Sequence, residues 1–244
     1  MVQSLIIGLN YENSPYELGG CANDALNYEK RIGRLNGEIN LYTGVCSAGT
    51  FYREMQSLAA NAAKYRMPKT IITFSGHGTQ YAHGDEGDGM QEALCFWNGH
   101  NIELVPDDVF RAYVRNIPGS VFVVLDSCFS GGMEKNAPKP RNNGWKRRFV
   151  QYDETMDVVL PTGFARTPKA STQNKTYWLF ACKESEVSWD TGTAGWFTLN
   201  FCQVYDATAN RPIAKVMGRT ASLCKPDQNP VYKIEGGTSL KHIF

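Results

Sequence analysis

The sequence predicts an α/β fold, with a mainly parallel central sheet of about six strands and helices on both faces. Apolar runs at 70–74 and 121–125 are continuous rather than alternating, which is typical of strands buried on both faces. Strand-like and helix-like stretches alternate along the chain, which favours parallel strands joined by crossover helices. Both runs end in loops that contain glycine, so two polar segments are expected beyond the carboxyl ends of neighbouring strands.

The individual elements follow from apolar patterning and from breaker residues. Strands are expected at 4–11, 39–42, 70–74, 120–125, 177–181 and 230–234, the last of them at an edge of the sheet. Helices are expected at 18–36, 48–65, 106–114 and 196–206. We expect a loop over 78–101, which is rich in glycine and acidic residues. A long mobile loop is expected over about 131–174, where several prolines interrupt a polar stretch.

Composition indicates one soluble domain over residues 1–244. The hydrophobic fraction is 42%, the charged fraction is 20% and the formal net charge is +1, which gives no reason to expect a nucleic-acid or membrane partner. The 7 cysteines are widely spaced and form no CxxC pair, so reduced thiols are expected rather than disulfides or a structural zinc. The N-terminus has no basic region before its apolar residues, so it predicts a strand and not a signal peptide. We therefore expect a cytoplasmic monomer.

A histidine and a cysteine follow the two apolar strands. His77 stands in Ser75-Gly76-His77-Gly78, and Cys128 stands in Asp126-Ser127-Cys128-Phe129-Ser130-Gly131-Gly132. A nearby imidazole can activate a cysteine thiol as a nucleophile. Backbone N–H groups of Gly78, in the loop with Gly76, and of Cys128 are candidates for an oxyanion hole, because glycine allows close approach of a carbonyl. Taken alone, a cysteine after an apolar strand is more often a buried structural thiol, and it is the combination of the two glycine loops, one with His and one with Cys, that favours a catalytic role.

These two loops together resemble the caspase–hemoglobinase clan of cysteine peptidases, and within it the metacaspases and orthocaspases. The histidine precedes the cysteine by about 50 residues, as in caspases, although the Q-A-C-x-G signature is absent. Further matches are Gly8 to Tyr11, Leu18 to Asp24, Asp85 to Gly89, Pro106 to Asp108, Ala181 to Glu186 and Gly195 to Thr198. The resemblance covers nearly all of 1–235. It implies a caspase-like three-layer sandwich and a dyad in which Cys128 attacks and His77 protonates the leaving amine.

The resemblance also implies an acidic S1 pocket. Asp24 and Asp126 match the positions at its floor, and Cys21 and Ser75 match its walls. Two carboxylates attract a guanidinium and repel an acidic side chain, so we expect an endopeptidase that cleaves protein or peptide substrates after Arg or Lys. Without the resemblance, Asp24 is equally compatible with a helix N-cap and Asp126 with a polar strand end.

Two segments outside the dyad bear on this interpretation. Lys146-Arg147-Arg148 lies in the long loop after Cys128. It is either a solvated turn or a basic segment that enters the S1 pocket of the same chain, and autocleavage would then occur after Arg148. Trp189 and Asp190, in the loop after the fifth strand, are candidate walls of neighbouring subsites.

Calcium is a possible ligand, because many metacaspases require it. Hard oxygen ligands are present at Asp85, Glu86, Asp88, Glu92, Asp107 and Asp108, but their spacing is not that of an EF-hand. Gln91 and Lys135 stand where the metacaspase pattern has acids. The expectation is therefore an enzyme without metal or other cofactor, as in many orthocaspases.

Two rival interpretations remain open. One is a catalytically silent caspase-like binding or regulatory module that needs a partner or ligand, which the presence of both His77 and Cys128 disfavours. The other is a clan member with a different P1 preference, which Asp24 and Asp126 disfavour.

Overall fold

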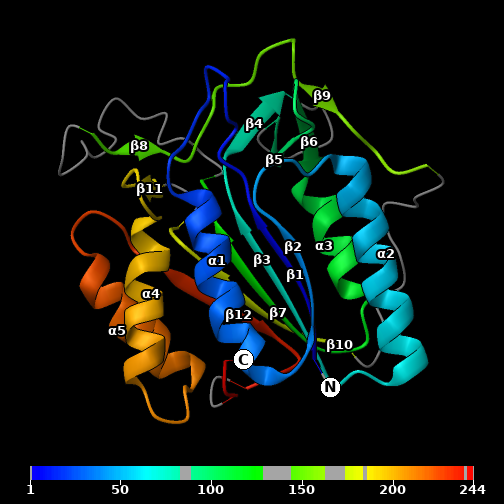
Figure 1. The fold of residues 1–244 in the computed structure, drawn as a ribbon, viewed down its shortest axis with the longest axis vertical. Helices are drawn as coiled ribbons and strands as arrows, with labels where there is room; N and C mark the ends of the chain where they lie inside the picture. The colour runs from blue at the N-terminus through cyan, green and yellow to red at the C-terminus, as the bar shows by residue number, and fades with distance from the viewer. Residues whose placement is uncertain are drawn as a thin grey trace.

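The computed structural model describes residues 2–82, 89–128, 144–162, 174–183, 186–238 and 241–243. Its centre is a six-stranded sheet in the order β12-β10-β7-β3-β1-β2 (Figure 1). The strands are β1 (Val2–Gly8), β2 (Glu38–Tyr42), β3 (Lys69–Ser75), β7 (Gly119–Asp126), β10 (Asn174–Phe180) and β12 (Val231–Glu235). All neighbouring pairs are parallel except β10 with the edge strand β12. The predicted mainly parallel sheet of six strands is confirmed.

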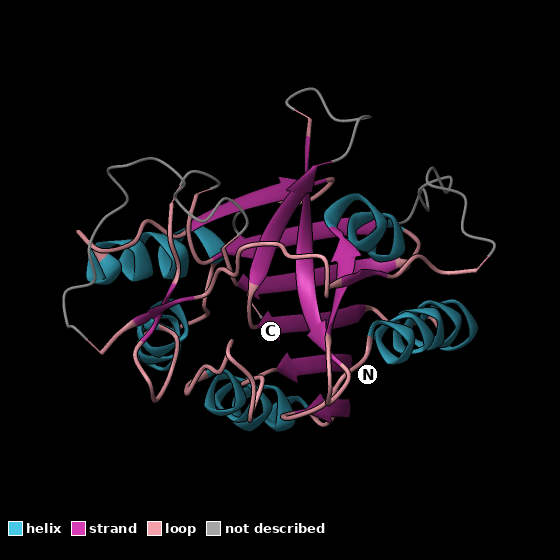
Figure 2. Cartoon of the chain, turned by 90° about the horizontal axis from the view of Figure 1, so that it is seen from above, coloured by secondary structure: helices cyan, strands magenta, loops and turns pink. Residues whose placement is uncertain are grey.

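Helices cover both faces of this sheet, as Figures 1 and 2 show. One face carries α1 (Cys21–Ile32), α4 (Trp196–Ala207) and α5 (Ile213–Cys224), and a short 3-10 turn, η1 (Gly33–Leu35), follows α1. The other face carries α2 (Ala48–Tyr65) and α3 (Asp107–Arg115). Among the described residues, none of the helices has the length and apolar character that crossing a bilayer requires.

The continuous apolar runs of β3 and β7 are explained by burial on both faces. Ile72 and Val123 point into the core under α2 and α3, whereas Ile71 and Phe122 point into the core under α1 and α4. All four side chains are fully buried. Each such side chain contributes about 1.5–3 kcal/mol through removal of apolar surface from water, so these strands form the most strongly held part of the sheet.

The predicted loop over 78–101 is wrong. Residues on either side of 83–88, which lie outside the described residues, form the antiparallel strands β4 (Gly78–Ala82) and β5 (Met90–Trp97), and β5 pairs in turn with β6 (Ile102–Pro106). Glycine and acidic residues dominate the composition of this stretch, but the strands β4 and β5 bury apolar side chains such as Tyr81, Leu94 and Phe96.

The long segment expected over about 131–174 is partly regular. Residues 129–143 and 163–173 lie outside the described residues, but 144–162 contain β8 (Lys146–Arg147) and β9 (Asp157–Val158). β8 pairs with β11 (Trp189–Asp190), and β9 pairs with β6. The prediction also missed α5, although Ile213, Val216 and Met217 recur at helical spacing and are buried.

Candidate active site

The carboxyl ends of β3 and β7 bring the two predicted catalytic loops side by side. Ser75 and Asp126 are register partners, and Gly76 N donates a hydrogen bond to Asp126 O at 3.3 Å. His77 and Cys128 each follow this pair by two residues, and both side chains are buried. Gly78 is packed so closely against the Cys128 carbonyl that an added Cβ would collide with it. Glycine is therefore required where the two loops touch.

The imidazole of His77 makes a hydrogen bond through one of its two ring nitrogens. Nε2 lies 2.7 Å from the carbonyl oxygen of Tyr16, and because a carbonyl only accepts, Nε2 carries the proton. Nδ1 is buried and has no hydrogen-bond partner among the described residues. The His77 main-chain N–H donates to the hydroxyl of Tyr11 at 2.8 Å, and the Tyr11 ring lies 4.8 Å from the imidazole. Burial lowers the pKa of His77 to about 4, so the ring is neutral at pH 7 with an open Nδ1 lone pair.

The sulfur of Cys128 is turned towards the loop before β11. It accepts a hydrogen bond from Ser188 N at 2.6 Å and lies 3.3 Å from Ser188 O. A hydrogen bond with Cys128, together with burial, raises the pKa of Cys182, which is therefore a neutral thiol beside the nucleophile candidate. Among the hydrogen bonds of the described residues, none joins the Cys128 sulfur to His77. The two side chains occupy neighbouring loops without direct pairing in this conformation.

A deeply buried slot beside these loops holds Arg148. Its guanidinium Nη2 lies 2.6 Å from Asp24 Oδ2 and 3.1 Å from Asp190 Oδ2, and Nη1 lies 3.1 Å from Asp126 Oδ2. Arg148, Asp24 and Asp126 have no exposed side-chain surface, and Asp190 has almost none. The two aspartates that the sequence marked for an acidic pocket do meet, and Asp190 joins them as a third carboxylate.

Backbone amides and hydroxyls orient the three carboxylates. Asp24 accepts from Gly195 N at 2.9 and 3.1 Å, and Asp126 accepts from the Thr198 hydroxyl at 2.6 Å and the Ser188 hydroxyl at 2.5 Å. Gly195 is the N-cap of α4, whose N-terminal end favours negative charge. Even so, burial raises the pKa of Asp24 to about 7, although the Arg148 guanidinium acts in the opposite direction.

The sequence-based alternative of an N-cap role for Asp24 is wrong. The N-cap of α1 is Gly20, which has no side chain to cap the helix, and Asp24 lies inside the first turn with its side chain in the slot. Gly20 N instead donates to Asp190 Oδ2 at 3.0 Å. Helix α1 therefore contributes both a carboxylate and a backbone donor to the slot.

The two predicted wall residues are placed differently. Cys21 begins α1, is buried, and its sulfur lies 3.7 Å from Asp190 Oδ2. Ser75 ends β3 and is buried next to Asp126 in the sheet, but its hydroxyl has no hydrogen-bond partner among the described residues. Cys21 thus contacts a slot carboxylate directly, whereas Ser75 only lies next to Asp126 as its register partner in the sheet.

The main chain of Arg148 lies between the two catalytic loops and the loop before β11. The carbonyl oxygen of Arg148 accepts hydrogen bonds from Gly78 N at 3.0 Å and Cys128 N at 3.1 Å, the two donors expected for an oxyanion hole. Arg148 N donates to Ser188 O at 3.0 Å, and Val150 N donates to Gly78 O at 3.1 Å. β8 pairs with β11 as a short added strand, and Arg148, which follows it at a bend, places its side chain in the slot.

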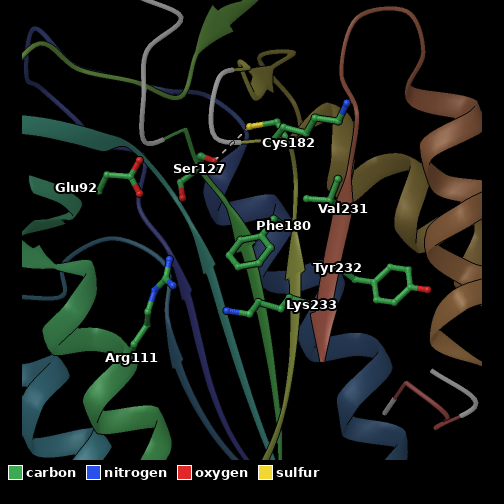
Figure 3. A pocket seen from close by; sticks show the side chains of 9 residues that line it. Glu92, Arg111, Ser127, Phe180, Cys182, Val231, Tyr232 and Lys233 are labelled. Atoms are coloured by element: carbon green, nitrogen blue, oxygen red, sulfur yellow. Dashed lines mark hydrogen bonds between the residues drawn. The ribbon is translucent and has the colours of Figure 1, made fainter. Parts of the chain in front are cut away.

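A separate cavity of about 330 Å³ lies beside Ser127, the residue before Cys128 (Figure 3). Its lining includes Ser127 and Cys182, which are joined by the interaction between the Cys182 sulfur and Ser127 O at 3.9 Å. Glu92 and Arg111 face it from the opposite wall in the same view. This cavity does not contain the dyad or the slot, and sequence reasoning did not anticipate it because its walls come from five distant segments.

The calcium candidates are only partly within the described residues. Asp85, Glu86 and Asp88 lie outside them. Asp107 accepts a hydrogen bond from Gln91 Nε2 at 2.8 Å and pairs with Arg111 at 3.1 Å, and Asp108 accepts from Val109 N at 2.7 Å. Within the ranges that the structure describes, no group of three or more His, Cys, Asp or Glu side chains is arranged to hold a metal ion.

Sequence reasoning missed three contributors to this site. Tyr16 supplies the carbonyl that orients His77, Tyr11 supports the His77 main chain, and Ser188 holds both the Cys128 sulfur and Asp126. Tyr11 had a usable signal, because it follows the carboxyl end of β1 at the same edge of the sheet. Tyr16 acts through its main-chain carbonyl, for which side-chain identity gives little signal, whereas Ser188 uses both its main-chain N–H and its hydroxyl.

Comparison with solved structures shows the fold class. A protein from Geobacter sulfurreducens superposes with a TM-score of 0.75 at 19% identity and covers 99% of this chain and 97% of its own. The Drosophila initiator caspase Dronc superposes with a TM-score of 0.55 at 14% identity, covering 95% of this chain and 78% of its own. The expected caspase-like sandwich is confirmed.

Comparison with curated sequences and family models gives the family. Metacaspase-4 of Arabidopsis thaliana is 26% identical over 181 residues, which are 67% of this chain and 42% of that protein. Metacaspase-1B of Aspergillus oryzae is 32% identical over 148 residues, which are 53% of this chain and 34% of that protein. The matched regions thus span less than half the length of these curated relatives. The model of the caspase domain family matches residues 3–234, so the chain belongs to the caspase domain family, with metacaspases among its relatives.

Proposed function

We propose that this domain is a cysteine endopeptidase that cleaves peptide bonds after Arg or Lys, with Cys128 as nucleophile and His77 as general base and acid. The observation that carries the proposal is the seating of Arg148. Its side chain lies among three carboxylates while its carbonyl oxygen accepts from the N–H groups of Gly78 and Cys128. Family membership adds to this, because the chain belongs to the caspase domain family and proteins named metacaspases are among its relatives.

The chemistry follows from the groups around the Arg148 carbonyl. His77 Nδ1 takes the thiol proton, and the Cys128 sulfur, turned away from Ser188 by rotation of its side chain, forms a bond to the carbonyl carbon. The N–H groups of Gly78 and Cys128 stabilise the oxyanion. The imidazolium then protonates the leaving amine as the C–N bond breaks, and water hydrolyses the thioester with His77 again as base. The Tyr16 carbonyl positions the ring throughout.

The slot supports basic P1 residues on electrostatic grounds. A guanidinium presents several donors in one plane and can reach all three carboxylates at once, as Arg148 does. An ammonium is a point charge that neutralises the slot with fewer fixed hydrogen bonds. An acidic side chain would add a fourth negative charge at a site without solvent. We therefore expect Arg to be cleaved faster than Lys, and Asp to be rejected.

The same pose supports autocleavage between Arg148 and Phe149. The test is intact mass and N-terminal sequencing of the purified protein after prolonged incubation, for the wild type, Cys128→Ala, Arg148→Ala and the matched control Arg147→Ala. We expect a new N-terminus at Phe149 in the wild type and in Arg147→Ala, and none in the other two. An unchanged mass in the wild type, or the same cleavage in Cys128→Ala, would contradict self-processing at this bond.

The alternative of a silent regulatory module has one observation in its favour. The Cys128 sulfur faces Ser188 and the slot is filled by the chain's own Arg148, which together describe a closed site. Alkylation with iodoacetamide followed by peptide mapping separates the two functions. A peptidase releases the 145–150 segment and exposes Cys128 to the reagent, whereas a silent module leaves it unlabelled in every folded form.

A further inference from the structure

The cavity beside Ser127 is large enough for a small molecule and has no part in the proposed peptidase chemistry. Its volume of about 330 Å³ is close to the lower limit for ligand pockets, about 300 Å³. Neither His77 nor Arg148 lines it. From the charge, the ring and the hydroxyl in its lining, we propose that this cavity binds a small aromatic carboxylate. The inference goes beyond the peptidase function and does not depend on it.

Positive charge predominates in the cavity lining. Arg111, Lys183 and Lys233 contribute three cations, whereas Glu92 is the single carboxylate among the described residues that line it. That carboxylate already accepts a hydrogen bond from Gln80 Nε2, at 3.5 Å. An anionic ligand is therefore favoured over a cationic one, because unlike charges attract across a partly enclosed space of low dielectric.

Two of these cations keep donors available for a ligand. Arg111, on α3, pairs with Asp107 through Nε at 3.1 Å, and its two Nη groups make no hydrogen bond to any of the described residues. Lys233, on β12, pairs with Glu235 at 3.2 Å, which occupies one of the three donors of an ammonium group. In the view of Figure 3 the charged ends of Arg111 and Lys233 lie on the same side of the Phe180 ring. A carboxylate there can accept from both.

A buried hydroxyl supplies a further polar group. Ser127 is only 4% exposed, and its Oγ has no hydrogen-bond partner among the described residues. Buried polar groups are almost always paired, so one without a partner in a cavity wall indicates a position where a ligand or water completes the bonding. The hydroxyl can donate to a carboxylate oxygen. This observation is independent of the surplus of cations and points to the same class of ligand.

The apolar part of the lining favours an aromatic ring. Phe180 lies in the cavity wall, and Val231 on the neighbouring strand lies beside it. The Phe180 ring is nearly parallel to that of Trp178, with an interplanar angle of 4° and centroids 6.1 Å apart. Trp178 is buried, so it holds the Phe180 ring in a fixed orientation. A fixed, flat apolar surface beside two cations suits a ligand that carries a ring and a carboxylate.

The experiment measures binding to the full chain by isothermal titration calorimetry. The probes are trans-cinnamate, its neutral isostere cinnamamide, and acetate. We expect cinnamate to bind with a dissociation constant of about 0.1–1 mM. Cinnamamide should bind at least about tenfold more weakly, because it cannot form charge-assisted hydrogen bonds. Acetate should also bind at least about tenfold more weakly, because it has no ring to bury.

Variants assign the binding to this cavity. Lys233→Met and Arg111→Met should each weaken cinnamate binding about three- to tenfold, and Ser127→Ala about two- to fivefold. Lys175→Met is the matched control, because Lys175 is an exposed lysine at the start of β10 and is not among the lining residues. It should leave the dissociation constant unchanged. Circular dichroism checks the fold of each variant, and Lys233→Met removes an exposed side chain whose loss the fold should tolerate.

Four results would overturn the proposal. These are no cinnamate binding up to about 10 mM, equal affinity for cinnamate and cinnamamide, unchanged affinity in both Lys233→Met and Arg111→Met, and equal weakening in Lys175→Met and Lys233→Met. The last would mean that the anion responds only to net charge. Binding is measured without a substrate, so each of these results would leave the peptidase function standing, and a failure of peptide cleavage would leave the carboxylate site standing.

Discussion

Strands β3 and β7 are held in different ways along their length. At their centres, Ile72 and Val123 are surrounded by other apolar side chains and need no specific partner. At their carboxyl ends, three buried carboxylates surround a single guanidinium from a segment that follows β7 by about twenty residues. The central region is held by apolar packing alone, whereas the end region depends on a cation that another segment supplies.

This difference has a physical basis in the cost of burying charge. Removing a carboxylate from water costs several kcal/mol, which attraction to a cation and oriented hydrogen bonds must offset. The slot has one cation for three carboxylates. Hydrogen bonds from the amides of Gly20 and Gly195 and from neighbouring hydroxyls offset the rest of the cost of burying these carboxylates. A region built in this way is suited to binding a basic side chain, because the empty slot is less stable than the filled one.

The largest effect should come from the nucleophile. Cys128→Ala removes one buried sulfur without altering the slot charges, so peptidase activity should fall by at least about 10³-fold while the domain stays folded. The measurement is initial rate on an Arg peptide, with circular dichroism as the folding control. Activity within tenfold of the wild type would place the nucleophile elsewhere.

The slot occupant should contribute as much stability as any core residue. In a Cys128→Ala background, which prevents cleavage, Arg148→Met should lower the free energy of unfolding by about 3–5 kcal/mol, because it leaves three buried carboxylates without a cation. Adding Asp24→Asn should restore part of the loss. Urea unfolding of the three proteins measures both steps, and a loss that Asp24→Asn deepens would contradict an electrostatic origin.

The core of β3 should respond differently to truncation. Ile72→Ala should cost about 2–5 kcal/mol through lost burial and the cavity left behind. Unlike the Arg148 effect, this loss should not be relieved by neutralising a slot carboxylate. Equal rescue of both variants by Asp24→Asn would mean that the two regions are not held by different forces.

Binding of basic substrates should strengthen as pH rises through neutrality. With Arg148 in the slot, burial raises the pKa of Asp24 to about 7 while the Arg148 guanidinium lowers it. We therefore expect a higher pKa for this carboxyl when no cation is bound. Binding of an arginine should therefore release a proton at pH values above the bound-state pKa, and KM for an Arg peptide should fall as the pH rises from about 7 to about 9. The dependence should be weaker in Asp24→Asn, and a KM that rises over this interval would contradict the assignment.

The smallest effect concerns the support of His77. Tyr11→Phe removes a hydroxyl that makes two buried hydrogen bonds. It accepts from His77 N at 2.8 Å and donates to Cys95 O at 2.7 Å. The loss should be about 1–3 kcal/mol in the free energy of unfolding, because two buried main-chain groups lose their partner. A kcat decrease with little change in KM would place the effect on imidazole orientation. An unchanged kcat would limit Tyr11 to a structural role.

The sheet could be predicted from the sequence because each of its central strands is marked by a pattern of consecutive residues. The runs 70–74 and 121–125 are apolar at every position, and burial on both faces requires that pattern. The antiparallel pair of β4 and β5 was missed because glycine and acidic residues dominate the composition of 78–101. Helix α5 was passed over although its apolar residues recur at helical spacing.

The site could be predicted only in part because its residues meet through topology. His77, Cys128, Asp24 and Asp126 were singled out by their loops and by family resemblance, and the structure gathers them at one edge of the sheet. Asp190 was noted only as a subsite wall, because nothing in its local sequence shows that a strand places it against Arg148. The Tyr16 carbonyl and the Ser188 amide have no signature in residue type at all.

The central claim is that the buried slot selects a basic P1 residue, and its most direct test is a set of initial rates on matched fluorogenic peptides ending in Arg, Lys or Asp. Rates are measured for the wild type and Cys128→Ala, with chelator and with millimolar calcium. We predict cleavage after Arg and Lys, at least about 10²-fold faster than after Asp because like charges buried together cost several kcal/mol. Cleavage should be absent in Cys128→Ala and equal with and without calcium. Preferred cleavage after Asp, or equal rates for all three peptides, would contradict the account.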